Sequence, residues 1–178
     1  VLHMLREYVG DKAFYAALHH YLKTNAFTSV EVDELRIAFE DTIGEDLHLF
    51  FDQWFLKSGH PTFDVNYQYQ EDGKALKISV RQTQDSLEFP SCFVMPLKIH
   101  AYFGKGNMEA YSFLMEERIQ DFYISDLEQK PLSVVFDGKN TILGLINENK
   151  TQEEYINQYL LSPYLGDKMI ALSNIQDK

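Results

Sequence analysis

The chain has 178 residues, of which 45% are hydrophobic and 14% aromatic, and its formal net charge is −11 at pH 7. This length indicates one or two domains, and so many aromatic side chains need a core, which argues against disorder. The acidic balance argues against phosphate backbones and anionic lipid surfaces, so we expect no nucleic acid and no membrane as a partner.

Residues 1–60 are predicted to be helical because their apolar side chains recur every three to four positions. The last of four predicted helices contains Trp54 and ends at Ser58-Gly59, where Pro61 prevents it from continuing. The chain begins in helical rhythm without a capping residue, and we expect that it was cut from within a larger protein. Helices cut from their domain should leave an apolar surface bare, so we expect a dimer formed through helices 1–60.

Residues 61–147 alternate between apolar and polar side chains, which is typical of strands. The first strand is predicted from Phe63 to Tyr69, with a turn at residues 71–74 and a returning strand from residue 75. Pro96 cannot donate to a ladder and is expected at an edge or a bulge, and Gly104–Asn107 is expected to form a turn. About seven strands follow one another at the spacing of an antiparallel β-sandwich, predicted at residues 63–69, 75–80, 93–103 and 108–115 and around 122–124, 132–136 and 141–146.

Two short helices are predicted after the strands. Thr151 and Glu154 form a capping box, and Ser162-Pro163 separates the two helices. Their apolar stripes contain Ile156, Tyr159 and Leu160 in the first helix and Leu165, Met169 and Leu172 in the second. Two helices cannot bury such stripes alone, so they are interpreted as the first unit of a helical repeat or as a hairpin resting on the β domain.

The sequence therefore predicts a multidomain α+β protein. Its parts are the closing helices of a larger domain at 1–60, an antiparallel β-sandwich at 61–147 and the start of an α-helical domain at 148–178.

Complete catalytic motifs are absent from the sequence. No two histidines are four residues apart, none is followed by Glu, and the adjacent His19 and His20 diverge by about 100° on a helix. Ser58 lacks a nucleophile motif, and Gly104–Asn107 lacks the third glycine of a dinucleotide loop. The single cysteine, Cys92, is interpreted as a small core residue. We therefore assign no catalytic residue, no metal ligand and no cofactor in this chain, and the substrate-binding residues are unknown.

The order of these signals resembles the zinc aminopeptidases of the aminopeptidase N type, the gluzincin family. The similar residues are VLHMLREYVGDKAFYAALHHYL and VDELRIAFEDTIGEDLHLFFDQWFLKSGHPTFDV, with a W…GxP element from Trp54 to Pro61. In that family similar residues close the thermolysin-like catalytic domain. A β-sandwich and a C-terminal domain of helical repeats follow.

This resemblance implies that the parent protein removes N-terminal residues from peptides through a zinc-activated water. The family's H-E-x-x-H zinc motif, its further Glu ligand, its GxMEN motif and its catalytic tyrosine would all precede Val1. No catalytic or zinc-binding residue is therefore carried over onto this sequence. We expect the 178-residue chain to be inactive and to act as a supporting segment, with zinc present in the full-length parent.

Two alternatives stay open. The parent could be a non-catalytic, aminopeptidase-like scaffold, because fold alone does not give activity. The chain could also be an Ig-like binding module flanked by helices, with Tyr67, Tyr69 and Tyr102 as an exposed stacking platform. The sequence predicts a soluble protein but does not distinguish cytoplasm from periplasm.

Overall fold

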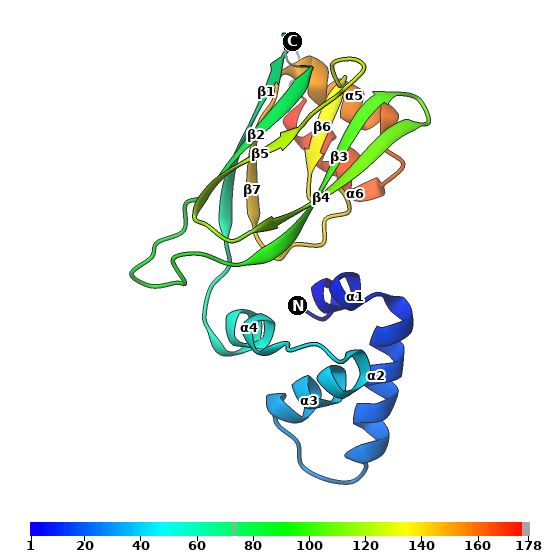
Figure 1. The fold of residues 1–178 in the computed structure, drawn as a ribbon, viewed down its shortest axis with the longest axis vertical. Coiled ribbons are helices and arrows are strands. Elements are labelled where there is room, and N and C mark those ends of the chain that lie inside the picture. Colours follow the sequence, from blue (N-terminus) through cyan, green and yellow to red (C-terminus); the bar gives the residue numbers. More distant parts are fainter. Residues whose placement is uncertain (73, 176–178) are drawn as a thin grey trace. The chain divides into compact units, whose positions relative to one another are not determined.

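A computed structural model describes residues 1–72 and 74–175, and the chain divides into two compact units (Figure 1). The helical unit contains residues 1–59 and the segment Leu87–Pro90. The sheet unit contains His60–Ser86 and the residues from Ser91 onward. The α+β class predicted from the sequence is confirmed. The assignment of residues 1–60, 61–147 and 148–178 to three separate domains stays a prediction.

The helical unit is built from short helices around an apolar core. The helices are α1 (Leu2–Val9), α2 (Asp11–Thr24), α3 (Val32–Ile43), α4 (His48–Phe51) and the π-helix η1 (Asp52–Leu56). The core side chains are Leu5, Phe14, Ala17, Phe39, Leu47 and Phe51. Gly44 ends α3 in the left-handed conformation, with φ +74°, which glycine adopts without steric cost.

The predicted fourth helix is divided. Its α-helical part ends at Phe51, and a π-turn continues to Leu56. The Phe51 and Phe55 rings stack with centroids 4.7 Å apart, and both Gln53 and Trp54 are buried. A π-turn inserts one extra residue into the helical turn and so brings the neighbouring side chains of Gln53 and Trp54 inward together. A regular helical period of 3.6 residues does not predict this.

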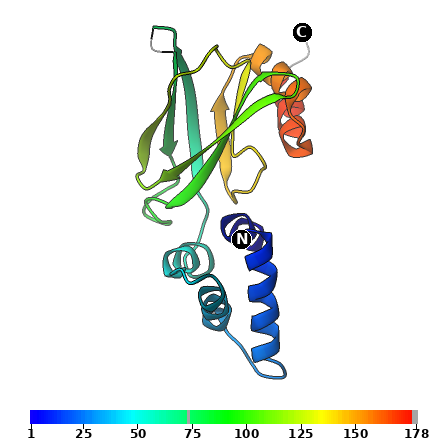
Figure 2. The same cartoon turned by 45° about the vertical axis from the view of Figure 1, so that its right-hand side comes forward.

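The sheet unit contains two sheets (Figure 2). The first has the order β5 (Ile119–Ile124), β2 (Ala75–Gln82), β1 (Thr62–Gln70), β7 (Leu145–Asn149), and the second has the order β4 (Asn107–Met115), β3 (Met95–Gly104), β6 (Ser133–Phe136). Strands β1 and β2 pair antiparallel from Phe63 and Gln82, whereas β1 and β7 pair parallel from Thr62 and Leu145. The predicted turn at 71–74 includes residue 73, which lies outside the described residues.

Pro96 lies in β3, the middle strand of the second sheet. Strand β6 pairs only with Ile99–Tyr102, so β4 is the one strand beside Pro96 in the described part of this sheet. On the side of Pro96 away from β4, the described part of the sheet has no ladder for its missing N–H to interrupt. Pro96 therefore lies at a local edge of the sheet, as predicted. The turn before β4 is also confirmed, with Gly106 at φ +76°.

A helical hairpin, α5 (Gln152–Leu161) and α6 (Leu165–Asn174), belongs to the same unit as the sheets. The predicted capping box is present, because Thr151 Oγ1 accepts from the Glu154 N–H at 3.2 Å and Glu154 accepts from the Thr151 N–H at 2.7 Å. The hairpin covers β3 and β6 (Figure 1). Among the described residues, no helix is long and apolar enough to cross a membrane.

The hairpin faces the sheets with an unexpected set of side chains. The predicted apolar stripes are turned outward, with exposed fractions of 62% for Leu160 and 75% for Leu165. The inward residues are Tyr155, Gln158, Ser162, Asp167 and Ala171. The stripes were located correctly in the sequence, but the side that covers the sheets is largely polar.

Candidate functional site

Two histidines of the helical unit lie beside carboxylates. His20 lies 3.8 Å from Asp41 on the surface, and His19 has no part in that pair. In the described part of the chain, one group brings together three potential metal ligands: Glu40, Asp46 and His48. His48 Nδ1 lies 2.9 Å from Asp46 Oδ1 and 3.4 Å from Glu40 Oε1.

Both carboxylates of this group already accept hydrogen bonds, including bonds from backbone N–H groups between α3 and α4. Glu40 Oε2 accepts from Arg36 at 2.6 Å, and Glu40 Oε1 accepts from the Leu47 N–H at 2.8 Å. The His48 N–H, donating to Asp46, holds the pKa of that carboxyl below its usual value. The arginine bound to Glu40 and the exposed side chains of Asp46 and His48 do not fit a catalytic zinc site.

A buried ion pair lies where β7 meets α5. Lys150 Nζ lies 2.9 Å from Glu148 Oε1, and the two side chains are 1% and 6% exposed. Lys150 Nζ also donates to Gln158 Oε1 at 2.8 Å. The same ammonium lies 5.7 Å from the ring centroid of Tyr67 and 5.5 Å from that of Tyr155. Because the ammonium is removed from water, burial lowers the pKa of Lys150, and Glu148 offsets part of this effect.

Glu148 is well supplied with donors besides Lys150. Its Oε1 accepts from the hydroxyl of Tyr67 and from the Phe136 N–H at 2.9 Å. Burial raises the pKa of Tyr67 well above its ordinary value, and the negative charge of Glu148 raises it further. This tyrosine therefore stays a neutral donor. Strands β1, β6 and β7 thus meet at one carboxylate.

A second buried acid, Asp167, is held by the hairpin and by β3. Its Oδ2 accepts from Ser162 Oγ at 2.8 Å and from Tyr102 Oη at 3.3 Å, and its backbone carbonyl accepts from Gln158 Nε2 at 2.8 Å. Burial raises the pKa of Asp167, and the two hydroxyl donors offset part of that rise. Gln158 therefore connects the Lys150 ammonium with the backbone of Asp167.

Three buried polar atoms have no hydrogen-bond partner among the described residues: His100 Nδ1, Ser133 Oγ and Asp167 Oδ1. His100 lies beside the Tyr164 ring, with centroids 5.4 Å apart, and burial lowers its pKa. In the described structure no histidine is hydrogen-bonded to a serine or cysteine side chain, so the geometry of an activated nucleophile is not found there.

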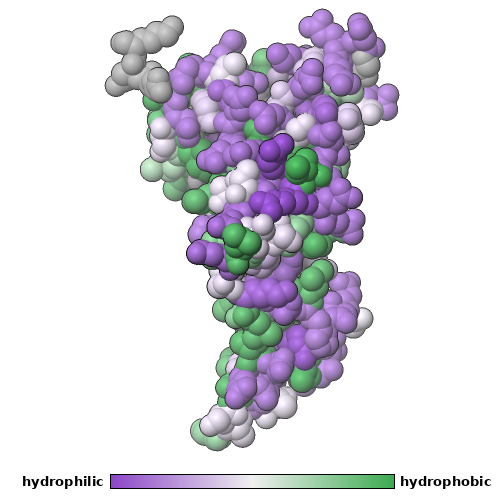
Figure 3. Space-filling model, turned by 90° about the vertical axis from the view of Figure 1, so that its left-hand side faces the viewer, coloured by the Kyte–Doolittle hydropathy of each residue, from purple (hydrophilic) through white to green (hydrophobic). Residues whose placement is uncertain are grey.

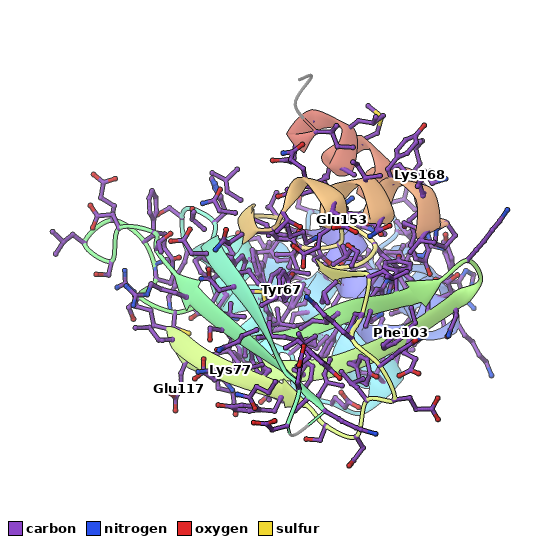
Figure 4. The ribbon with its side chains drawn as sticks, turned by 90° about the horizontal axis from the view of Figure 1, so that it is seen from above. Tyr67, Lys77, Phe103, Glu117, Glu153 and Lys168 are labelled. Atoms are coloured by element: carbon purple, nitrogen blue, oxygen red, sulfur yellow. The ribbon has the colours of Figure 1, made fainter. Side chains whose placement is uncertain are left out.

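The sheet unit also has an open polar hollow of about 270 Å³. Three carboxylates, Glu109, Asp126 and Glu128, line it together with Phe103 and Tyr111. Burial, followed by the hydrogen bond to Glu109, raises the pKa of Tyr111 to about 12. Figure 4 labels Phe103 and, in another part of the sheet unit, Tyr67.

Some residues lie where the sequence predicted them and others do not. Trp54 is 7% exposed, and Cys92 is only partly buried, with burial raising its pKa. Tyr102 is 1% exposed and Tyr67 faces Lys150, so the tyrosines do not form an exposed stacking platform. The buried polar cluster around Glu148 and Lys150 was missed, although Glu148 shares the strand face of the apolar Ile146, which is a signal for an inward carboxylate.

Comparisons with known proteins agree on one family. Residues 1–54 match the family model described as the peptidase family M1 domain. The chain is 29% identical over 132 residues to tricorn protease-interacting factor F2 of Thermoplasma volcanium, a match that covers 71% of this chain and 15% of the relative. It is 30% identical over 87 residues to aminopeptidase N of Streptomyces lividans, covering 49% of this chain and 10% of the relative.

The fold is also similar to a solved structure. Aminopeptidase A of Legionella pneumophila, solved with aspartic acid, superposes with a TM-score of 0.81 over 98% of this chain and 20% of that chain. The sequence identity is 14%, so this likeness concerns the fold alone. The chain thus spans a small fraction of the length of the proteins that it matches.

Proposed function

The chain belongs to the M1 peptidase family, and on this premise we propose that it is a supporting segment of a zinc-dependent aminopeptidase, without the active site. The observation that carries the proposal is the match of residues 1–54 to the peptidase family model. The similarity to the Thermoplasma factor extends over 132 residues, well beyond that segment. The parent would remove N-terminal residues from peptides, and its zinc would be held by residues outside this sequence.

Within such a parent we assign separate roles to the two units. The helical unit would complete the catalytic domain, and the two sheets would form the β-sandwich that follows it. The hairpin α5–α6 would begin the C-terminal helical domain. Its outward apolar side chains support this role, because Leu160, Leu165 and Met169 are more than half exposed and would be buried by further helices.

The helical unit supports the expectation of a dimer. Its surface carries exposed large apolar side chains, including Leu22 at 67% and Leu56 at 66%, and Figure 3 shows green, hydrophobic atoms on it. In the parent, other parts of the protein would cover them. We expect analytical ultracentrifugation of the 178-residue chain to detect a dimer that is lost when the upstream sequence is added.

The decisive experiment joins the natural upstream sequence to this chain. We expect one zinc per polypeptide and release of N-terminal residues from peptides, whereas the 178-residue chain alone should bind no stoichiometric zinc and show no turnover. A complete polypeptide that lacks H-E-x-x-H would reject the peptidase and favour the non-catalytic scaffold. Turnover by the 178-residue chain alone would reject the supporting role.

A further inference from the structure

The α5–α6 hairpin buries few large apolar side chains. Of the five buried residues in the segment 155–171, Gln158, Ser162 and Asp167 are polar. In Figure 4 the hairpin carries Glu153 and Lys168, and Tyr67 lies toward the strands beneath it. An interface of this composition gains little from the hydrophobic effect, so specific polar contacts must hold it in place.

Lys150 is placed to supply the central contact. It lies between the last residue of β7 and the first of α5, and its side chain is 1% exposed. Its ammonium contacts a carboxylate of β7 at 2.9 Å, an amide oxygen of α5 at 2.8 Å and the rings of Tyr67 and Tyr155. One cation therefore contacts both the sheet and the hairpin.

The cage around this ammonium has the features of a cation-binding site. Two aromatic rings lie within 6 Å of the charge, a carboxylate neutralises it, and an amide oxygen accepts a hydrogen bond. Glu148 and Gln158 are in turn fixed by Phe136 and Asp167. Two partners of the ammonium are thus positioned by backbone groups.

We propose that the α5–α6 hairpin is locked onto the sheets by the Lys150 ammonium, which is bound as an internal ligand in the cage of Tyr67, Glu148, Tyr155 and Gln158. Loss of this charge leaves the Glu148 carboxylate buried without its counter-charge, which is a strongly destabilising situation. The hairpin then opens as a unit while the sheets stay folded. The lock can be measured in the 178-residue chain, so the result is independent of any peptidase activity.

Lys150→Met tests the lock because methionine keeps the apolar stem and removes the ammonium. Hydrogen exchange with mass spectrometry should show amide exchange in residues 152–174 faster by on the order of a hundredfold, with β1, β2 and the helical unit unchanged. Lys168→Met is the matched control. Lys168 lies on the same hairpin, 5.7 Å from the Tyr159 ring, but no carboxylate contacts it among the described residues. Unchanged exchange in Lys150→Met, or equal loss in Lys168→Met, would overturn the proposal.

The pair can be separated from packing by a double variant. Glu148→Gln should also loosen the hairpin, and Lys150→Met with Glu148→Gln together should lose clearly less protection than the sum of the two. Additive losses would contradict a bound ion pair.

The proposal can also be tested on the wild-type chain, so this measurement does not require any variant to fold. Under amine acetylation, Lys150 should react far more slowly than Lys168. If both lysines react at the same rate, the cage is open and the proposal fails.

Discussion

Gly59, at the end of the helical unit, offers a sharp test of the packing. Its φ is +86°, a conformation that side chains other than glycine rarely adopt. A Cβ atom at this position would lie under 3.0 Å from three ring atoms of Phe89, in the segment that joins β2 to β3. Both residues belong to the helical unit. Gly59→Ala therefore combines a backbone penalty with a steric clash.

The two costs can be estimated separately. The positive φ costs a β-carbon about 1–2 kcal/mol, and overpacking costs about 1–3 kcal/mol. We expect Gly59→Ala to lower the free energy of unfolding of the helical unit by roughly 2–5 kcal/mol. Gly44→Ala is the control for the backbone alone, because φ is +74° and no atom lies within 4 Å of the added Cβ; it should lose about 1–2 kcal/mol.

Urea unfolding followed by the fluorescence of Trp54 is the appropriate assay, because this single tryptophan is buried in the helical unit. Removing the ring with Phe89→Ala should relieve the clash, so the double variant should lose less than the sum of the two single variants. If Gly59→Ala loses no more stability than Gly44→Ala, the Phe89 ring does not lie against Gly59 and the reasoning is refuted.

Three further variants test the two units. Trp54→Ala should cost about 3–5 kcal/mol by circular dichroism, since a buried aromatic side chain leaves a cavity. Gly138→Ala should cost about 1–3 kcal/mol, because the added Cβ would lie under 3.0 Å from three ring atoms of His100. Asp167 holds its proton more tightly when folded, because burial raises its pKa, so its contribution to stability is greatest below about pH 4 and falls as the pH rises through the folded pKa. Asp167→Asn should flatten that fall in thermal melts between pH 4 and 7.

Each of these variants has a control or a contrary result. A loss below about 1 kcal/mol in Trp54→Ala would mean that the indole faces solvent. Gly104→Ala, with no atom within 4 Å of the added Cβ, should be nearly neutral beside Gly138→Ala. Asp137 is also buried with a raised pKa, so a residual slope of the same sign should persist in Asp167→Asn. An unchanged slope would place the titrating group elsewhere.

The features that the sequence predicted well depend on local patterns. Alternation from Phe63 to Tyr69 matches β1, and the Thr151 capping box is present as expected. Gly59 and Pro61 separate the last helical turn from the first strand. In each case a few neighbouring residues determine the backbone, so no distant contact is needed to predict it.

The features that were missed depend on contacts between distant residues. An apolar stripe at helical spacing identifies α5 as a helix, but it does not determine which side of the helix covers the sheets. Here the polar side, which contains Gln158, covers them. Glu148 meets Tyr67 across 81 positions of sequence, which no local pattern reveals. The π-turn at Asp52–Leu56 likewise follows the packing of two aromatic rings. The buried cluster could therefore be predicted only as one inward carboxylate.

The parallel pairing of β1 with β7 has a mechanical consequence. Because Thr62 lies beside Leu145 and Asn66 beside Asn149, the polypeptide reaches this strand pair at one end and leaves it at the other. Tension applied to the two flanking segments would pull the strands past each other along their length. All the hydrogen bonds between them would be strained simultaneously, instead of breaking one after another. A strand pair with this geometry therefore resists extension between its two flanking segments.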